Sequence, residues 1–343
     1  MTSRSLYPFQ STAIRFLQKS NIHLALTAPT GSGKGVVLEV LAENPEERIL
    51  LLTPLIALAR QQRIRFELAG IPAHRVRILS PESALLQERR IQEWDPTLVA
   101  VDEAHCIYEW GERFRPAYGQ LFGLLQRLRV SRSLWMSATF PRTLFQDLLN
   151  NVDGSWTRLG TFSFPKNLDS NFLQTRPTDR VEIIRESVLH ESDPGILFVG
   201  TRKEVRRYFS VLGPMRPMLP YHAGLSDEER RAVENRLLLD KCARYSIVAT
   251  NAFGMGMDFP SLRWVKLAQA PYSLLALTQA FGRVARAGKS GVASVYWTEE
   301  DFRFAGLLLG NAPKRAHEEL AGLRQYLEGT DASRREFERG FFL

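Results

Sequence analysis

Short apolar runs alternate with amphipathic stretches along most of the chain. In the first half, five runs have the length and character of buried strands; they span residues 23–27, 48–53, 76–79, 97–101 and 133–137. In the second half, five more span residues 195–199, 217–221, 245–249, 263–268 and 291–297. Apolar residues return at helical spacing between the runs, as in 141–151, 202–212, 226–239 and 273–286. The alternation predicts an α/β protein with parallel sheets flanked by helices.

The two series of elements predict two domains, because 343 residues are too many for one ordinary core. Pro165 and its polar neighbours mark a junction between the series. We therefore place the first domain at residues 1–162 and the second at 163–302. Residues 303–343 are helical in pattern and lie outside the second predicted sheet.

A glycine-rich turn, Ala28-Pro-Thr-Gly-Ser-Gly-Lys34, follows the first predicted strand and precedes a helical pattern. Glycines allow backbone N–H groups to approach phosphate oxygens, and a lysine adds a point charge to the β- and γ-phosphates. The turn therefore predicts a nucleotide-binding phosphate loop. The candidate contacts are Pro29, Thr30, Gly31, Ser32, Gly33, Lys34 and Gly35.

Gly35 departs from the usual loop, which carries Ser or Thr after the lysine. That hydroxyl normally binds the magnesium ion that bridges the β- and γ-phosphates. Magnesium readily keeps several waters, so we expect a water beside Gly35 and a weakened, not abolished, metal site. The alternative is a degenerate site that binds nucleotide and barely turns it over.

A second motif, Asp102-Glu-Ala-His105, follows the apolar run 97–101. Ligands of open α/β sheets bind at the carboxyl ends of the strands, where these side chains are expected. Asp102 is suited to hold Mg²⁺ through water, and Glu103 to orient and deprotonate an attacking water. The two motifs together predict hydrolysis of a nucleoside triphosphate.

The second half carries a basic segment, Gln279-Ala-Phe-Gly-Arg-Val-Ala-Arg-Ala-Gly288. Arg283 and Arg286 are three residues apart, so a helix over 273–286 would place both on one face. Planar guanidinium groups neutralise a transferring phosphoryl group well, which suggests a nucleotide bound between the two halves. The alternative is a solvated basic helix face.

Composition bears on the cellular compartment of the protein and on the kind of partner it binds. The formal net charge of +8 suggests a polyanionic partner. Cys106 and Cys242 are the only cysteines, too few for a disulfide framework or a four-cysteine zinc site. No stretch resembles a signal peptide or a bilayer-spanning segment, so we expect a cytoplasmic protein without a membrane partner.

In the order of its motifs the chain resembles the RecQ-type DNA helicases of superfamily two, over about residues 5–300. The matching segments are Leu6–Gln10, Ala28–Lys34, Thr53–Leu58, Asp102–His105, Ser137–Thr139, Phe198–Arg202, Tyr221–Leu225, Ala249–Asp258 and Gln279–Gly288. An aromatic-rich loop over 106–118 separates RecQ proteins from other DEAH helicases. The resemblance implies two tandem RecA-like domains and ATP- and Mg²⁺-dependent 3′→5′ helicase or translocase activity on single-stranded or 3′-tailed DNA, in repair or recombination.

The resemblance also implies roles for individual residues. Tyr7 and Gln10 match the adenine-reading motif, and His105, Gln279, Arg283 and Arg286 match catalytic positions, with Arg286 as the arginine finger. The implied DNA contacts are Pro54, Trp110, Phe114, Arg115, Tyr118, Thr201, Arg202, His222, Thr250 and Phe253. From the residues alone, packing in the core is the favoured interpretation of the aromatic-rich loop, and His222 could equally be structural.

Other positions depart from the family pattern. Tyr7 stands where RecQ proteins usually have Arg, and Glu112 where the aromatic-rich loop usually has His. Residues 320–335 resemble the start of the RecQ zinc-binding domain, but Leu327 and Ser333 stand at positions where that domain has cysteines. We therefore expect no bound zinc. We also expect no winged-helix domain and no HRDC domain. We expect a monomer, with possible protein partners in repair. A DNA-stimulated ATPase or nucleotide-gated DNA-binding module that needs a partner for unwinding is the alternative.

Overall fold

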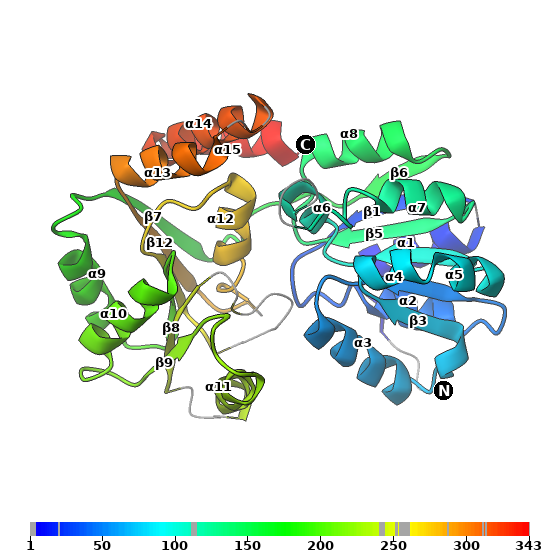
Figure 1. Ribbon diagram of the computed structural model, residues 1–343, viewed down its shortest axis with the longest axis horizontal. Helices are drawn as coiled ribbons and strands as arrows, with labels where there is room; N and C mark the ends of the chain where they lie inside the picture. The colour runs from blue at the N-terminus through cyan, green and yellow to red at the C-terminus, as the bar shows by residue number, and fades with distance from the viewer. Residues whose placement is uncertain are drawn as a thin grey trace. The chain divides into compact units, whose positions relative to one another are not determined.

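The computed structural model describes residues 5–19, 21–110, 115–239, 244–250, 253, 261–286, 288–310, 312 and 314–342. The chain divides into two compact units, one of residues 1–162 with 338–343 and one of residues 163–337. We placed residues 303–343 outside the second domain because of their helical pattern. In the structure, residues 303–337 of this segment group with the second unit. Each unit is built around one parallel sheet (Figure 1), as the alternating pattern predicted.

The first unit contains a six-stranded sheet in the order β3-β2-β4-β5-β1-β6. Its strands are β1 (His23–Thr27), β2 (Ile49–Leu52), β3 (Val76–Leu79), β4 (Leu98–Val101), β5 (Ser133–Ser137) and β6 (Trp156–Leu159). All its strand pairs are parallel, with Leu26 opposite Met136 in β1 and β5. The β1, β4 and β5 strands are buried on both faces, which explains their uninterrupted apolar runs.

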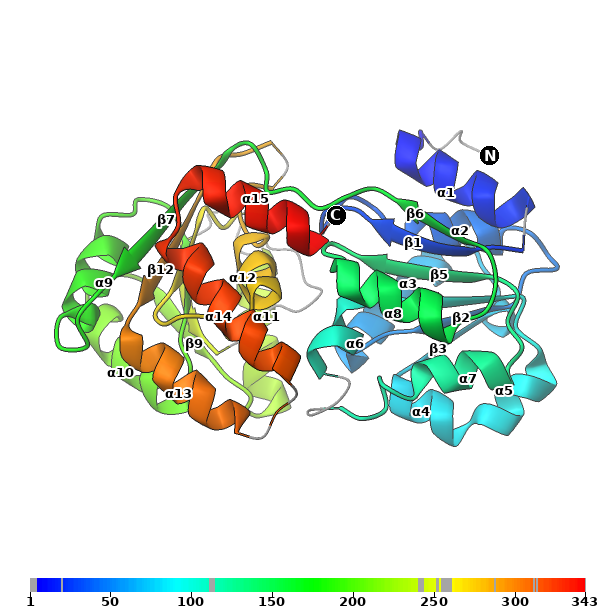
Figure 2. The same cartoon turned by 90° about the horizontal axis from the view of Figure 1, so that it is seen from above.

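Helices cover both faces of this sheet (Figure 2). One layer, formed by α1, α2 and α3, packs on strand residues such as Leu24, Leu51 and Leu134. On the other face, Phe122 of α7 contacts Trp135 of β5, and Phe145 of α8 contacts Trp156 of β6. The helices are α1 (Pro8–Lys19), α2 (Val36–Ala42), α3 (Ile56–Leu68), α4 (Pro81–Leu86), α5 (Glu88–Trp94), α6 (His105–Trp110), α7 (Leu121–Arg127) and α8 (Arg142–Asn151).

The second unit contains another parallel six-stranded sheet, in the order β7-β12-β11-β8-β10-β9. Its strands are β7 (Leu168–Gln174), β8 (Gly195–Phe198), β9 (Met218–Tyr221), β10 (Ser246–Ala249), β11 (Trp264–Leu267) and β12 (Gly291–Trp297). Its helices are α9 (Arg180–Leu189), α10 (Arg202–Leu212), α11 (Asp227–Leu239), α12 (Leu274–Phe281), α13 (Glu299–Leu309) and α14 (Lys314–Glu328). The last helix, α15 (Asp331–Phe342), begins in this unit, and its last residues group with the first.

Two strands and one helix end differ from the predicted elements. The β6 and β7 strands lie at sheet edges, and neither has the buried apolar run by which we identified the other ten. The helix that we expected over 273–286 ends at Phe281, and Gly282 follows as its C-cap. Ala285 then adopts a left-handed backbone with φ of 57°, which a continuing helix cannot contain.

Candidate functional site

The phosphate loop lies between β1 and α2 and depends on two glycines. Gly31 and Gly33 have φ of 79° and 82°, a backbone region that strains other residues. A Cβ on Gly33 would also lie 2.8 Å from Nε2 of Gln10. The hydroxyl of Ser32 is buried, and no described residue hydrogen-bonds to it. The turn is therefore tightly packed around its two glycines, and its binding of phosphate stays a prediction.

Gln10 supports the loop from α1. Its Nε2 donates to the Gly33 carbonyl at 2.9 Å, and its Oε1 accepts the backbone N–H of Tyr7 at 2.8 Å. The amide is buried, whereas the Tyr7 ring is exposed and stacks on Phe9 with ring centroids 6.3 Å apart. Both residues stand beside the loop, and their adenine-reading role stays a prediction.

Lys34 closes the turn after β1, and Asp102 follows β4, so both stand at the carboxyl edge of the first sheet. The ammonium of Lys34 donates to the carbonyls of Ala28 and Pro29 at 2.8 and 3.1 Å. The pKa of the Asp102 carboxyl is raised to about 6. Burial is the largest cause and the Glu103 carboxylate adds to it, while the charge of Lys34 opposes the shift.

Glu103 occupies a turn with a strained backbone, between β4 and the residues that contact Ser137–Thr139. Its φ is 49°, and its N–H donates to Oδ1 of Asp102 at 3.0 Å. Nδ1 of His105 lies 3.3 Å from Oε2 of Glu103 and 2.9 Å from the hydroxyl of Ser137 at the end of β5. Burial alone would lower the pKa of His105, but Cys106 and Glu103 raise it well above the usual value. A polar chain thus links the carboxylate pair to residues 137–139.

Two residues of α3 reach this site although no motif marks them. Nε2 of Gln62 donates to Oδ2 of Asp102 at 3.4 Å. Arg65 forms a 2.7 Å ion pair with the buried Glu39 of α2, and its guanidinium fills the space beside Gly35 where we expected a water. The three-residue spacing on a helix could have suggested a shared face, but nothing local indicates what that face meets.

The aromatic-rich segment is described only in part. Phe114 and the side chain of Trp110 lie outside the described residues, so their DNA-sensing role stays a prediction. Tyr118 is 1% exposed, and burial raises the pKa of its hydroxyl. Its ring is a core side chain that no base can reach in this structure. Arg115 donates to both carboxylate oxygens of Glu82 and to the carbonyl of Pro54, so it braces the segment.

In the second unit, the predicted DNA contacts meet at the start of α10. Thr201 caps the helix, and its side chain and that of Glu204 form a reciprocal capping box. Arg202 is exposed, and a Cβ on Gly224 would lie 2.8 Å from its Nη1. His222 is largely buried, and its Nδ1 accepts the N–H of Gly224 at 3.2 Å. The histidine therefore holds the turn that faces Arg202.

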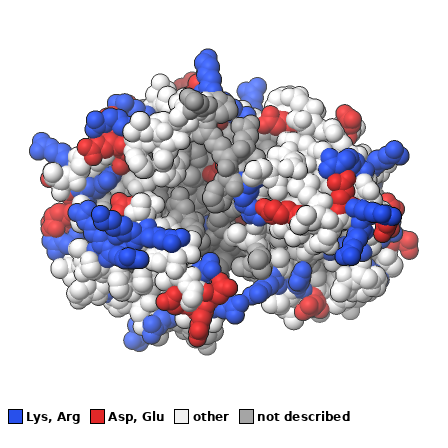
Figure 3. Space-filling model, in the orientation of Figure 1, with Lys and Arg blue, Asp and Glu red and all other residues white. Residues whose placement is uncertain are grey.

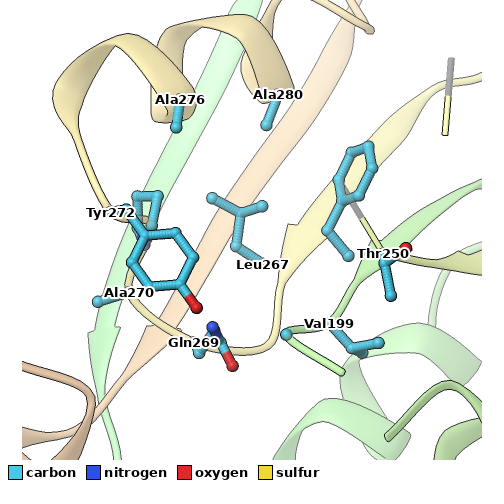
Figure 4. A pocket seen from close by; sticks show the side chains of 11 residues that line it. Val199, Thr250, Leu267, Gln269, Ala270, Tyr272, Ala276 and Ala280 are labelled. Atoms are coloured by element: carbon cyan, nitrogen blue, oxygen red, sulfur yellow. The ribbon is translucent and has the colours of Figure 1, made fainter. Parts of the chain in front are cut away.

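A pocket of about 280 Å³ lies at the carboxyl ends of the central strands of the second sheet. Thr250 after β10, Gln269 after β11, and Tyr272 line it (Figure 4). Phe253 is 1% exposed and packs edge-on against Tyr221, with ring centroids 4.9 Å apart. Thr250 thus borders an accessible pocket, whereas the ring of Phe253 is buried and serves packing here.

The basic segment of the second unit differs from the expected arrangement. The α12 helix ends at Phe281, before Arg283 and Arg286. Our prediction that a helix over 273–286 places both arginines on one face is therefore wrong. Arg283 is largely buried, and Nε of Arg286 donates to the Gly282 carbonyl at 2.7 Å. Gln279 lies one turn earlier, within the helix. The roles of all three residues in hydrolysis stay predictions.

The first-unit site suits a magnesium–nucleotide. The glycine cradle offers backbone donors, Lys34 offers a cation, and the Asp102 carboxylate is a hard oxygen ligand of the kind Mg²⁺ takes. Magnesium would supply charge neutralisation at the phosphates. Among the described residues, no group of three or more His, Cys, Asp and Glu could hold a metal ion, and the absence of zinc stays a prediction. Within the same residues, no helix is long and apolar enough to cross a membrane.

Comparisons with known proteins find helicase families in both units. The DEAD/DEAH box helicase family matches residues 7–95, and the helicase conserved C-terminal domain matches residues 179–288. The chain is 28% identical over 350 residues to the ATP-dependent DNA helicase RecQ of Bacillus subtilis, covering 93% of this chain and 58% of that protein. It is 33% identical over 208 residues to the RecQ-like DNA helicase BLM of Xenopus laevis, covering 59% and 15%. The chain thus spans little more than half of the first relative's length, and less of the second.

Solved structures share the fold. The structure of Mss116p bound to ssRNA and AMP-PNP gives a TM-score of 0.69 at 18% identity, over 90% of this chain and 72% of that one. The DUF1998 helicase MrfA bound to DNA and AMPPNP gives 0.65 at 20% identity, over 86% and 48%. Both likenesses support the two tandem RecA-like domains that the motif order implied.

Proposed function

We propose that this chain, which belongs to the RecQ-type family of DEAD/DEAH box helicases, couples ATP hydrolysis to 3′→5′ movement along single-stranded DNA. The observation that carries the proposal is the convergence at one sheet edge of the phosphate loop after β1, Ser137 at the end of β5, and the carboxylates after β4. These strands are neighbours in the sheet order, so their carboxyl ends lie together.

In this proposal each side chain at the sheet edge has one task. Lys34 binds the β- and γ-phosphates, Asp102 holds the magnesium ion, and Glu103 orients and deprotonates the attacking water. His105 connects Glu103 to Ser137 by the contacts described above. That connection is a route by which DNA bound elsewhere could change the orientation of Glu103. Arg286 remains the proposed arginine finger.

The DNA contacts that we propose centre on α10. Arg202, Lys203, Arg206 and Arg207 are exposed, and Lys and Arg side chains gather over this helix (Figure 3). Clustered cations bind the phosphate backbone without reading sequence. The side chain of Thr201 is already engaged in the cap, so it contributes by shaping the helix start. A helicase that moves along any sequence needs contacts of this kind.

Gly35 favours a second candidate function. Without the hydroxyl, the chain could be a nucleotide-gated DNA-binding module or a DNA-stimulated ATPase that unwinds only with a partner. The two candidates differ in turnover and in strand displacement, not in binding. A protein that hydrolyses ATP readily but separates no strands would be the DNA-stimulated ATPase.

The test is to measure magnesium-dependent ATP turnover with and without single-stranded DNA, together with strand displacement on 3′-tailed, 5′-tailed and forked duplexes. We expect turnover that rises with DNA and displacement of the 3′-tailed and forked substrates only. Single-stranded RNA serves as the comparison polymer, and Glu103→Gln as the inactive control. Displacement of the 5′-tailed duplex alone would refute the 3′→5′ polarity. If the protein turned over no ATP with any polymer, the proposed ATPase activity would be refuted.

A further inference from the structure

The side chain of Arg65 fills the space beside Gly35. An ideal Cβ on Gly35 would lie 2.8 Å from Nη1 of Arg65 and 3.2 Å from its Cζ. A serine or threonine hydroxyl extends one bond beyond that Cβ, toward the metal-bound phosphates. The guanidinium therefore stands in the region from which other phosphate loops offer their magnesium ligand. A cation replaces a neutral oxygen there.

Glu39 determines how Arg65 is oriented. Nη2 of Arg65 lies 2.7 Å from Oε1 of Glu39, whose side chain is 4% exposed. The arginine side chain is 36% exposed, so the pair runs from the buried side of α2 toward the loop surface. A guanidinium is planar and presents five donors in a rigid fork. Fixing one nitrogen on Glu39 therefore also fixes the edge that lies against Gly35.

The same face of α3 reaches the second motif. Gln62 lies three residues before Arg65 and donates to Oδ2 of Asp102 at 3.4 Å. Residues at this spacing share a helix face. One helix face thus contacts the metal-binding carboxylate through Gln62 and the phosphate-loop helix through Arg65. Because Gln62 on the same helix face contacts Asp102, the Arg65–Glu39 ion pair lies beside the candidate site and not at an unrelated surface position.

We propose that Arg65, oriented by Glu39, is a nucleotide-binding residue whose guanidinium donates to an oxygen of the ATP triphosphate beside Gly35. The inference rests on the proposed function, because it requires the loop to bind ATP. A guanidinium has no lone pair for Mg²⁺, so Asp102 and waters hold the metal while Arg65 neutralises phosphate charge directly. Binding of the triphosphate should then depend on magnesium less than it would with a hydroxyl at residue 35.

The test measures binding without turnover, by titrating a fluorescent non-hydrolysable ATP analogue in EDTA and in excess magnesium. Removing Arg65 alone would leave the Glu39 carboxylate buried, so the main variant is Glu39→Gln/Arg65→Gln. Arg60→Gln removes one arginine charge from an exposed position of α3 and is the control for the loss of a cation from this helix. We expect the double variant to bind about ten-fold or more weakly in EDTA, and the control to stay within about two-fold.

A second arm restores the missing hydroxyl. Adding Gly35→Ser to the double variant should tighten binding in magnesium and leave the affinity in EDTA unchanged. In the parent chain, Gly35→Ser should weaken binding in EDTA, because the new Cβ displaces the guanidinium. The hydroxyl and the arginine would thus be alternatives for one position, with opposite dependence on the metal.

Thermal unfolding and the parent's own affinity separate the possible failures. If Glu39→Gln/Arg65→Gln unfolds cooperatively and binds in EDTA as tightly as the parent, the proposal is overturned and the pair only packs α2 against α3. If that variant does not fold, Arg65→Lys keeps a cation on Glu39 but shortens the reach to Gly35, and unchanged EDTA affinity there overturns the proposal too. A parent that binds no analogue even in magnesium refutes ATP binding itself, and this inference with it.

Discussion

Arg115 connects the aromatic-rich segment to two other parts of the first unit. Its Nε and Nη2 donate to the two carboxylate oxygens of Glu82 at 2.8 and 2.7 Å, and its Nη1 donates to the Pro54 carbonyl at 2.6 Å. These bonds fix the chain directly after residues 110–114. We predict that Glu82→Gln impairs DNA stimulation of the ATPase as Arg115→Gln does, because either variant releases the brace.

The size of the effect follows from exposure. The Arg115 side chain is 21% exposed and that of Glu82 is 43% exposed, so solvent screens the pair. We assign it about 1 kcal/mol of stability, high for a screened pair because the contact is bidentate. For a unit of this size, that loss lowers Tm by about 2–4 °C.

The same pair predicts a pH dependence. Burial alone would raise the pKa of Glu82, but hydrogen bonds from Arg115, from the Glu82 backbone N–H and from Ser80, together with the Arg115 charge, outweigh burial and hold the pKa below the ordinary 4.5. A carboxyl whose pKa is lowered by folding stabilises the fold above its unfolded-state pKa. Its contribution is therefore complete above pH 4.5 and is lost as the pH falls through the lower folded-state value.

The assay is a double-mutant cycle over Arg115→Gln and Glu82→Gln, read by thermal unfolding at pH 7 and by DNA titration of ATPase at two salt concentrations. Arg127→Gln, which breaks the bidentate pair with Glu88, is the matched control and should leave DNA stimulation unchanged. We expect the two test variants to be non-additive by about 1 kcal/mol. The brace is refuted if Arg115→Gln alone weakens DNA binding and flattens its salt dependence, which would make Arg115 a phosphate contact.

Three further predictions concern hydrolysis and the loop. Glu103→Gln should lower ATP turnover by about 10²-fold or more while nucleotide binding persists, and normal turnover would exclude Glu103 as the base. Gly33→Ala should weaken nucleotide binding, because its Cβ meets Gln10 at 2.8 Å; Gly70→Ala, with φ of 72° and open space around it, isolates the effect of backbone strain and should bind normally. Arg286→Ala should reduce turnover by about 10³-fold at unchanged nucleotide affinity, measured in single turnovers, and a smaller loss in turnover than in affinity would argue against an arginine finger.

Ten of the twelve strands found in the described residues could be predicted because each carries a nearly continuous apolar run. A central strand such as β4 is buried along its whole length, and its sequence records that burial directly. The β7 strand, Leu-Asp-Ser-Asn-Phe-Leu-Gln, pairs only with β12 and exposes most of its side chains. An edge strand is held by backbone hydrogen bonds to one neighbour, which leave little trace in side-chain pattern.

The end of α12 was harder to predict for a different reason. Apolar residues continue past Phe281 at helical spacing, through Val284 and Ala285. These side chains are buried, so the pattern correctly reported burial. It could not report that Gly282 ends the helix and that Ala285 turns left-handed, since burial and backbone conformation are separate properties.

Gly35 shows why a motif should be interpreted together with the residues packed on it. Along the sequence, the glycine is a missing ligand, and a water is the simplest replacement. In three dimensions, Arg65 from a helix thirty residues later occupies that space, and buried Glu39 keeps it there. A serine Cβ at residue 35 would lie 2.8 Å from Nη1 of Arg65, so the guanidinium would have to move away from its present place. In our proposal, the Arg65 guanidinium takes the place of the usual Ser or Thr hydroxyl beside the phosphates. We expect this replacement to change how strongly nucleotide affinity depends on magnesium.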